Sequence, residues 1–250
     1  MVTRRSTDRL LSVSGHHQRY LRWAGRTAFL PLIAFIIATA FGKVPWPDID
    51  AGGRPMLDYA LKNHCAEGQA IFWFVVAAGT GMFLVLVSAV YQQRAEKTPL
   101  AVQIMIFFGA VWTALEAAAG GSFLVVGLLG RGFAAFGSHP TELFIVSALW
   151  DTANAFATLG VLALAIALLA LASVNRADPV LPRTLTNRVL PVTGVYLILI
   201  NLISVAFIPT GLWSPASFGM AIIGFAPAFL WQFAVSFTLL RRTRHNSTSH

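Results

Sequence analysis

The sequence predicts an all-α integral membrane protein, a polytopic bundle of about six transmembrane helices. Hydrophobic residues make up 56% of its 250 residues and charged residues only 11%, whereas soluble domains carry about 25% charged residues. Several apolar stretches also reach the length of about 20 residues that a helix needs to cross a bilayer. Because no hydrophilic stretch is long enough to fold separately, we expect a single membrane domain.

Six apolar segments account for most of the chain, and short polar segments separate them. Each apolar segment predicts one membrane-spanning helix, so the bundle covers residues 27–240. A basic segment, residues 1–26, precedes the bundle, and a polar tail, residues 241–250, follows it. The six predicted spans are residues 27–42, 69–90, 100–129, 142–172, 189–208 and 218–240.

The first span has a second interpretation, a cleaved secretory signal. Basic residues precede an apolar stretch, and residues 38–40 (Ala-Thr-Ala) resemble a small-residue cleavage site. However, the basic region is longer than in a typical signal, and the loop that follows fits the topology of a retained helix. We therefore expect the first span to be retained.

The basic residues predict that both termini lie in the cytoplasm. Of the 18 Lys and Arg residues, six precede the first span, two lie between the second and third, three between the fourth and fifth, and three after the sixth, which makes fourteen on one side. The other side holds four, Lys43, Arg54, Lys62 and Arg131. Because cytoplasmic loops are enriched in basic residues, we assign the richer side to the cytoplasm and the chain to the plasma membrane. This placement explains the net charge of +8 without nucleic acid as a partner.

The longest loop between spans, residues 43–68, contains three prolines and is not expected to form one continuous helix. Its residues His64, Cys65 and Glu67 fall close together, but three mixed ligands are a weak signal for a metal site. A single cysteine also excludes an intrachain disulfide and a cysteine-based metal cluster. We therefore predict that these three residues are ordinary loop residues and that no metal or cofactor binds there. The carboxylates of the same loop, Asp48, Asp50 and Asp58, lack the spacing of a calcium-binding loop.

The candidate binding residues are polar side chains inside the spans: Glu116, Asp151, Asn154 and Asn201. A carboxylate is costly in hydrocarbon and normally faces a partner or a water-filled cavity. Estimated from the helix rise, Glu116 and Asp151 lie at similar depth on adjacent antiparallel spans. The sequence therefore predicts that the two acids share a polar cavity that opens outward. The amides of Asn154, Asn201 and Gln232 have an alternative role as interhelical hydrogen bonds that fix the bundle.

Helical spacing predicts the faces on which these residues lie. In the third span, Glu116 shares a face with Gly109, Gly120 and Gly127, and small residues let membrane helices approach closely. We expect this face to contact a neighbouring helix and Glu116 to point into the bundle, with the pair Gly120-Gly121 as a candidate bend. In the fourth span the polar residues follow the same spacing, and small residues occupy the opposite face, which predicts packing on both sides. The polar residues are Ser147, Asp151, Asn154 and Thr158, and the small ones Gly160, Ala163, Ala167 and Ala170.

Three classes of function fit these features. A small proton- or cation-coupled transporter explains paired acids at a cavity, with a proton, a cation or a small molecule as substrate. A non-catalytic membrane subunit or sensor, with a membrane-protein partner or a second copy, explains small-residue faces without motifs. A membrane enzyme acting on lipid or quinone would use both acids with His139, but we assign no catalytic residue. The spans lack histidines for haem and lysines for a Schiff base, and the chain lacks protease and nucleotide-binding motifs.

Short motifs in the second half of the chain resemble uncharacterised bacterial six-span membrane protein families. They are Asp151-Thr152-Ala153-Asn154, Leu181-Pro182-Arg183 and Val192-Thr193-Gly194, and the resemblance covers about a third of the chain. It implies a helical bundle in a membrane and no particular reaction.

Overall fold

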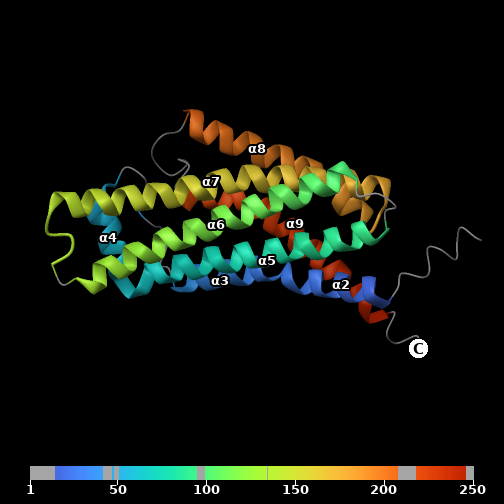
Figure 1. Ribbon diagram of the computed structural model, residues 1–250, viewed down its shortest axis with the longest axis horizontal. Helices are drawn as coiled ribbons and strands as arrows, with labels where there is room; N and C mark the ends of the chain where they lie inside the picture. The colour runs from blue at the N-terminus through green and yellow to red at the C-terminus, as the bar shows by residue number, and fades with distance from the viewer. Residues whose placement is uncertain are drawn as a thin grey trace, which may run out of the picture.

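The computed structural model describes residues 15–41, 47, 51–94, 99–133, 135–207 and 218–245, and these residues form helices without any β-strand. The helices form an elongated bundle (Figure 1). Six helical segments in the described part are long and apolar enough to cross a membrane. The predicted all-α class and the six candidate spans are thereby confirmed, while the assignment of the termini to the cytoplasm stays a prediction.

The first span begins earlier than predicted. Helix α2 (Gly15–Thr27) leads through a two-residue turn into α3 (Leu30–Phe41), and the membrane-length segment runs over His17–Ile37. Pro31 accounts for the turn, because proline lacks an N–H and its ring clashes with the carbonyl of Thr27. Both helices pack against α5. The basic segment before the predicted span is thus partly helical and belongs to the bundle.

Three long helices form the centre of the bundle: α5 (Cys65–Arg94), α6 (Leu100–Gly132) and α7 (Pro140–Ala177). Pro99 precedes α6 and Pro140 opens α7, positions that helices tolerate because the first N–H groups have no intrahelical partner. The glycine face of α6 contacts α5 as expected, since a Cβ at Gly120 would lie 3.1 Å from the carbonyl oxygen of Ala70. Helix α6 continues without interruption through Gly120 and Gly121.

The long loop contains a short helix, α4 (Gly53–Leu61), and a 3₁₀ turn, η1 (Lys62–His64), before α5 begins. As predicted, it is not one continuous helix. Helix α4 closes one end of the bundle, because Gly53 abuts the backbone of Leu143 and Gly130 of α6 abuts Leu57. Among the described residues no group of His, Cys, Asp or Glu side chains is arranged to hold a metal ion; Asp48 and Asp50 lie outside them.

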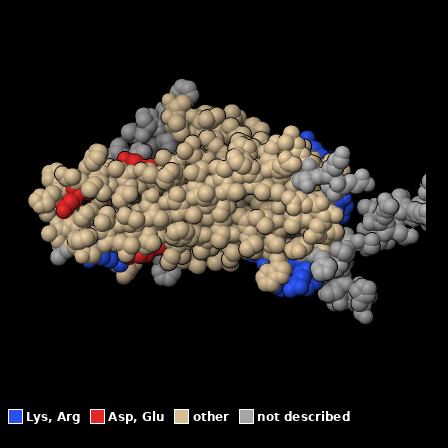
Figure 2. Space-filling model, viewed as in Figure 1, with Lys and Arg blue, Asp and Glu red and all other residues tan. Residues whose placement is uncertain are grey.

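The opposite end, where α5 ends at Arg94 and α7 at Ala177, is called the basic end below. Figure 2 shows Lys and Arg side chains at this right-hand end, both signs of charge toward the other end, and a broad uncharged band between them. A wide band without charged side chains is the surface that hydrocarbon chains require.

The last two helices are α8 (Leu190–Phe207), which follows a π-helical turn, η2 (Leu185–Val189), and α9 (Phe218–His245), which contains Pro227. Proline at position 227 frees the carbonyl of Ile223, its partner four residues earlier in an α-helix. The Tyr196 hydroxyl of α8 donates to this carbonyl at 3.1 Å. In return, Trp231 Nε1 of α9 donates to the Leu185 carbonyl of the π turn at 3.0 Å.

We expect Tyr196→Phe to lower the free energy of unfolding by about 1 kcal/mol, because the carbonyl of Ile223 then loses its donor in a membrane helix. Thermal unfolding in detergent, followed by circular dichroism, measures the change. The same substitution is then made in a Pro227→Ala background. There the backbone N–H of alanine can donate to the carbonyl of Ile223, so the Tyr196 hydroxyl is no longer needed. If Tyr196→Phe costs as much in the Pro227→Ala background as in the unsubstituted chain, the hydroxyl does not serve the freed carbonyl.

Candidate functional site

The four candidate residues lie on two opposite sides of α7: Glu116 of α6 on one side, and Asp151, Asn154 and Asn201 on the other. Glu116 of α6 lies against Gly160, where a Cβ would overlap with its Oε1 atom. Asp151 precedes Gly160 by nine residues, which is two and a half turns and about 13 Å along the axis. Asp151 therefore faces away from Glu116. The predicted cavity shared by the two acids is not formed, although Glu116 does point into the bundle.

Glu116 is enclosed by an aromatic core. Its side chain is 0% exposed, and neither carboxyl oxygen has a hydrogen-bond partner among the described residues. Trp112 lies one turn earlier on α6, and its ring packs against Phe225 of α9, which also contacts Trp73 of α5. The indole N–H groups of Trp73 and Trp112 are likewise buried without an acceptor in the described part. Polar atoms of both kinds are thus held close together in an apolar core without being paired.

The other candidates lie along the contact between α7 and α8. A Cβ at Gly194 of α8 would lie 3.3 Å from the carbonyl oxygen of Ala165 of α7, which fixes the two contacting faces. The four polar residues of α7 precede Ala165 by 7, 11, 14 and 18 residues, all close to whole helical turns. They therefore continue the same face. We call this interface the polar seam: Ser147, Asp151, Asn154 and Thr158 of α7, with Asn201 and Ser204 of α8.

Antiparallel packing brings the polar residues of α8 to those of α7. Asn201 follows Gly194 by seven residues, close to two turns, and so lies on the contact face about 10 Å along the axis. Counting the same rise backward from Ala165 places Thr158 at that level. Asn154, Thr158, Asn201 and Ser204 are all buried. Two of the predicted residues, Asn154 and Asn201, are thereby brought to one interface, with Asp151 one turn beyond Asn154.

Hydrogen bonds within each helix engage the side-chain donors of Asn154, Thr158 and Asn201. The amide of Asn154 donates to the carbonyl of Trp150 at 2.9 Å, and that of Asn201 to the carbonyl of Leu197 at 2.8 Å. The Thr158 hydroxyl donates to the carbonyl of Asn154 at 3.0 Å. The two amide groups thus lie on the buried interface with their N–H groups bonded to their own helices.

Asp151 adds a carboxyl group to this interface. Ser147 lies one turn before Asp151 on α7. The Oδ1 atom of Asp151 is buried without a hydrogen-bond partner in the described part of the chain. The seam thus holds one carboxyl group beside amide and hydroxyl side chains. Such a set suits a cation, which is bound through carboxylate and carbonyl oxygens, or a proton.

Other residues predicted from the sequence have structural roles. Gln232 of α9 and Thr80 of α5 hydrogen-bond to each other at 3.2–3.4 Å, both buried, as expected of an interhelical amide. His139 and Glu142 form a capping box at the start of α7, and Glu142 Oε2 also accepts the N–H of Gly137 at 2.7 Å. His139 lies 21 residues before Gly160, about 30 Å along α7. It therefore does not combine with Glu116 in one acid–base site.

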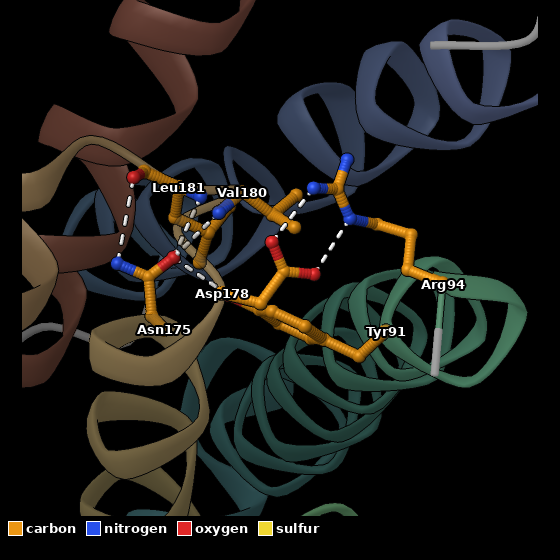
Figure 3. A network of polar contacts seen from close by, with 6 residues as sticks. All are labelled: Tyr91, Arg94, Asn175, Asp178, Val180 and Leu181. Carbon is orange, nitrogen blue, oxygen red and sulfur yellow. Dashed lines mark hydrogen bonds and ion pairs between the residues drawn. The ribbon is translucent and has the colours of Figure 1, made fainter. Parts of the chain in front are cut away.

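A polar network at the basic end was not predicted. Figure 3 shows Asn175 of α7 at its centre, where Oδ1 accepts the Tyr91 hydroxyl at 2.6 Å and the backbone N–H groups of Val180 and Leu181 at 3.0 and 2.8 Å. Beside it, Arg94 and Asp178 form a two-point ion pair with both distances 2.6 Å. The network ties the end of α5 to the turn between α7 and α8.

The six apolar helices, with a broad uncharged band across the face in Figure 2, define an integral membrane protein. Comparisons with protein-family models, with curated proteins and with solved structures found no match.

Proposed function

We propose that this protein is a small cation-coupled carrier of the plasma membrane, with the polar seam as its binding site for a proton or another cation. The observation that carries the proposal is Asp151, which lies at an interface with two buried amide side chains. Its Oδ1 atom is buried and has no hydrogen-bond partner among the described residues. Ionisable groups at membrane depth are costly and usually mark a pathway for ions or protons.

The charge distribution supports access from outside the cell. With fourteen basic residues on one side of the membrane, the positive-inside rule orients the basic end toward the cytoplasm. Asp151 then lies in the outer half, 11 residues or about 16 Å from the start of α7 at Pro140. Figure 1 shows α8 leaning away from α7 toward its C-terminal end, on this same side.

Ion flux into proteoliposomes tests the proposal. We expect the protein to carry flux under a Na⁺, K⁺ or H⁺ gradient, read with an ion-sensitive dye, and Asp151→Asn to reduce the flux to that of empty vesicles. Asp58→Asn makes the same chemical change at an exposed residue of α4 and should leave the flux unchanged. Absence of flux under all three gradients contradicts a carrier, and full flux in Asp151→Asn contradicts the seam as its site.

A second candidate function, a non-catalytic subunit, is favoured by a groove of about 610 Å³ between α5 and α6. Small residues line it, among them Gly81 of α5 and Gly109, Ala110 and Ala114 of α6. The Thr113 hydroxyl in this groove donates to the carbonyl of Gly109, so the surface offers few polar atoms. Such a surface lets a further membrane helix approach closely. Co-purification of a stable membrane partner, together with absence of flux, would support this function.

A further inference from the structure

Helix α2 presents a basic face to the outside of the bundle. Arg19, Arg22 and Arg26 are all exposed, and their spacing of three and four residues places them on one side of the helix. The opposite side is fixed to the bundle, because Ala24 is fully buried and Ser236 of α9 donates to the carbonyl of Gly25. The three guanidinium groups are therefore held outward by packing.

These arginines differ from three others in the described part of the chain, Arg54, Arg94 and Arg131, which pair with carboxylates. Arg94 pairs with Asp178 and Arg131 with Glu67, both at 2.6 Å. The arginines of α2 form no ion pair with a described carboxylate within 4.0 Å. Like charges three and four residues apart on a helix repel each other. An anion bound across them would relieve this repulsion.

The position of α2 indicates where the anion comes from. The membrane-length segment begins at His17, so the arginines lie where the chain enters the bilayer. Trp23 among them is 47% exposed, and the Arg26 guanidinium lies 4.8 Å from its ring centre. Exposed Trp and Arg side chains at the edge of a span are typical of the level of lipid headgroups. Figure 2 shows basic side chains on this end of the molecule, where Figure 1 places α2.

We propose that α2 binds the headgroup phosphates of anionic phospholipids in the leaflet at the basic end. Guanidinium groups match phosphate oxygens with paired hydrogen bonds. A headgroup with a net negative charge is favoured over a zwitterionic one such as phosphatidylcholine, because the positive choline group would be repelled by the arginines. The site is separate from the polar seam and does not depend on the proposed transport.

Lipid binding to the full-length protein tests the proposal. Native mass spectrometry from detergent, with phosphatidylglycerol or phosphatidylcholine added, should show retention of phosphatidylglycerol in preference to phosphatidylcholine. Arg19→Gln with Arg22→Gln should weaken phosphatidylglycerol binding about thirtyfold, because each basic residue near an anionic surface contributes about fivefold. Arg183→Gln with Arg188→Gln removes two exposed charges from the same end on another element and should leave it nearly unchanged.

Three outcomes would overturn the proposal: an equal loss in both double variants, no loss in either, or displacement of the lipid by millimolar inorganic phosphate. The first would show a diffuse attraction, and the last a small-anion site. The variant Arg19→Lys with Arg22→Lys tests the proposal separately, in case the glutamine variant loses lipid binding only because it misfolds. The lysine variant keeps both charges and should keep the preference for phosphatidylglycerol, and loss of the preference in this folded variant would also contradict the proposal.

Discussion

Asn175→Ala should lower the free energy of unfolding by about 3 kcal/mol or more. The side chain is 0% exposed, and its Oδ1 atom accepts three donors, the Tyr91 hydroxyl and two backbone N–H groups (Figure 3). Alanine removes the acceptor and leaves these donors unpaired, and each buried orphan donor costs about 1–3 kcal/mol. Chemical unfolding in detergent, followed by tryptophan fluorescence, measures the loss.

Two variants of the same network provide graded controls. Tyr91→Phe removes only one donor and should cost about 1 kcal/mol. Arg94→Ala breaks the ion pair between Arg94, which is 27% exposed, and Asp178, which is 40% exposed. Because exposed ion pairs contribute little, this substitution should lower the free energy of unfolding by between about 0 and 1 kcal/mol. If Arg94→Ala destabilises the protein as much as Asn175→Ala, the ion pair rather than the amide holds this end together.

Gly160→Ala should destabilise the protein by about 1–3 kcal/mol, the usual cost of overpacking a filled core. The added methyl group would overlap with Oε1 of Glu116, whose side chain is 0% exposed, so the carboxyl group would have to shift within the core. In a Glu116→Ala background the same substitution should be nearly neutral, because the remaining contact, with Trp112, is at an ordinary distance of 3.4 Å. A double-mutant cycle of thermal stabilities measures this coupling.

Gly121 provides the matched control for this cycle. A Cβ there meets no atom within 4 Å among the described residues, so Gly121→Ala should be neutral or should stabilise α6 slightly through its helix propensity. A loss in Gly160→Ala that persists in full after Glu116→Ala would show that the carboxyl group is not what Gly160 accommodates.

Hydropathy predicted five of the six spans to within a few residues, because membrane helices are recognised by uninterrupted apolar composition. The helical segment that carries the first candidate span begins earlier than the predicted span. Arg19, Arg22 and Arg26 suggested a segment outside the membrane, whereas the structure extends a helix through them and buries Ala24 on its other side. A helix that is basic on one face and packed on the other has no long apolar run to reveal it.

Periodicity predicted which residues share a helix face but not which neighbour each face meets. Asp151, Asn154 and Thr158 do lie on one side of α7, and Glu116 does point inward. The prediction of a shared cavity was wrong, because the depth of a residue along a helix does not tell which way its side chain points. Glu116 instead meets the small-residue face of α7. Asn175 was missed for another reason, since its partner Tyr91 lies 84 residues away and a polar residue near the end of a span resembles an ordinary loop boundary.

Two hydrogen bonds, which join α9 to α8 and to the π turn η2, bear on how far the two sides of the seam can separate. Tyr196 holds the carbonyl that Pro227 sets free, and Trp231 holds the carbonyl of Leu185, so the helices are fastened at two heights. Because Gln232 of α9 is also hydrogen-bonded to Thr80 of α5, a displacement of α8 away from α7 is resisted through α9 by the centre of the bundle.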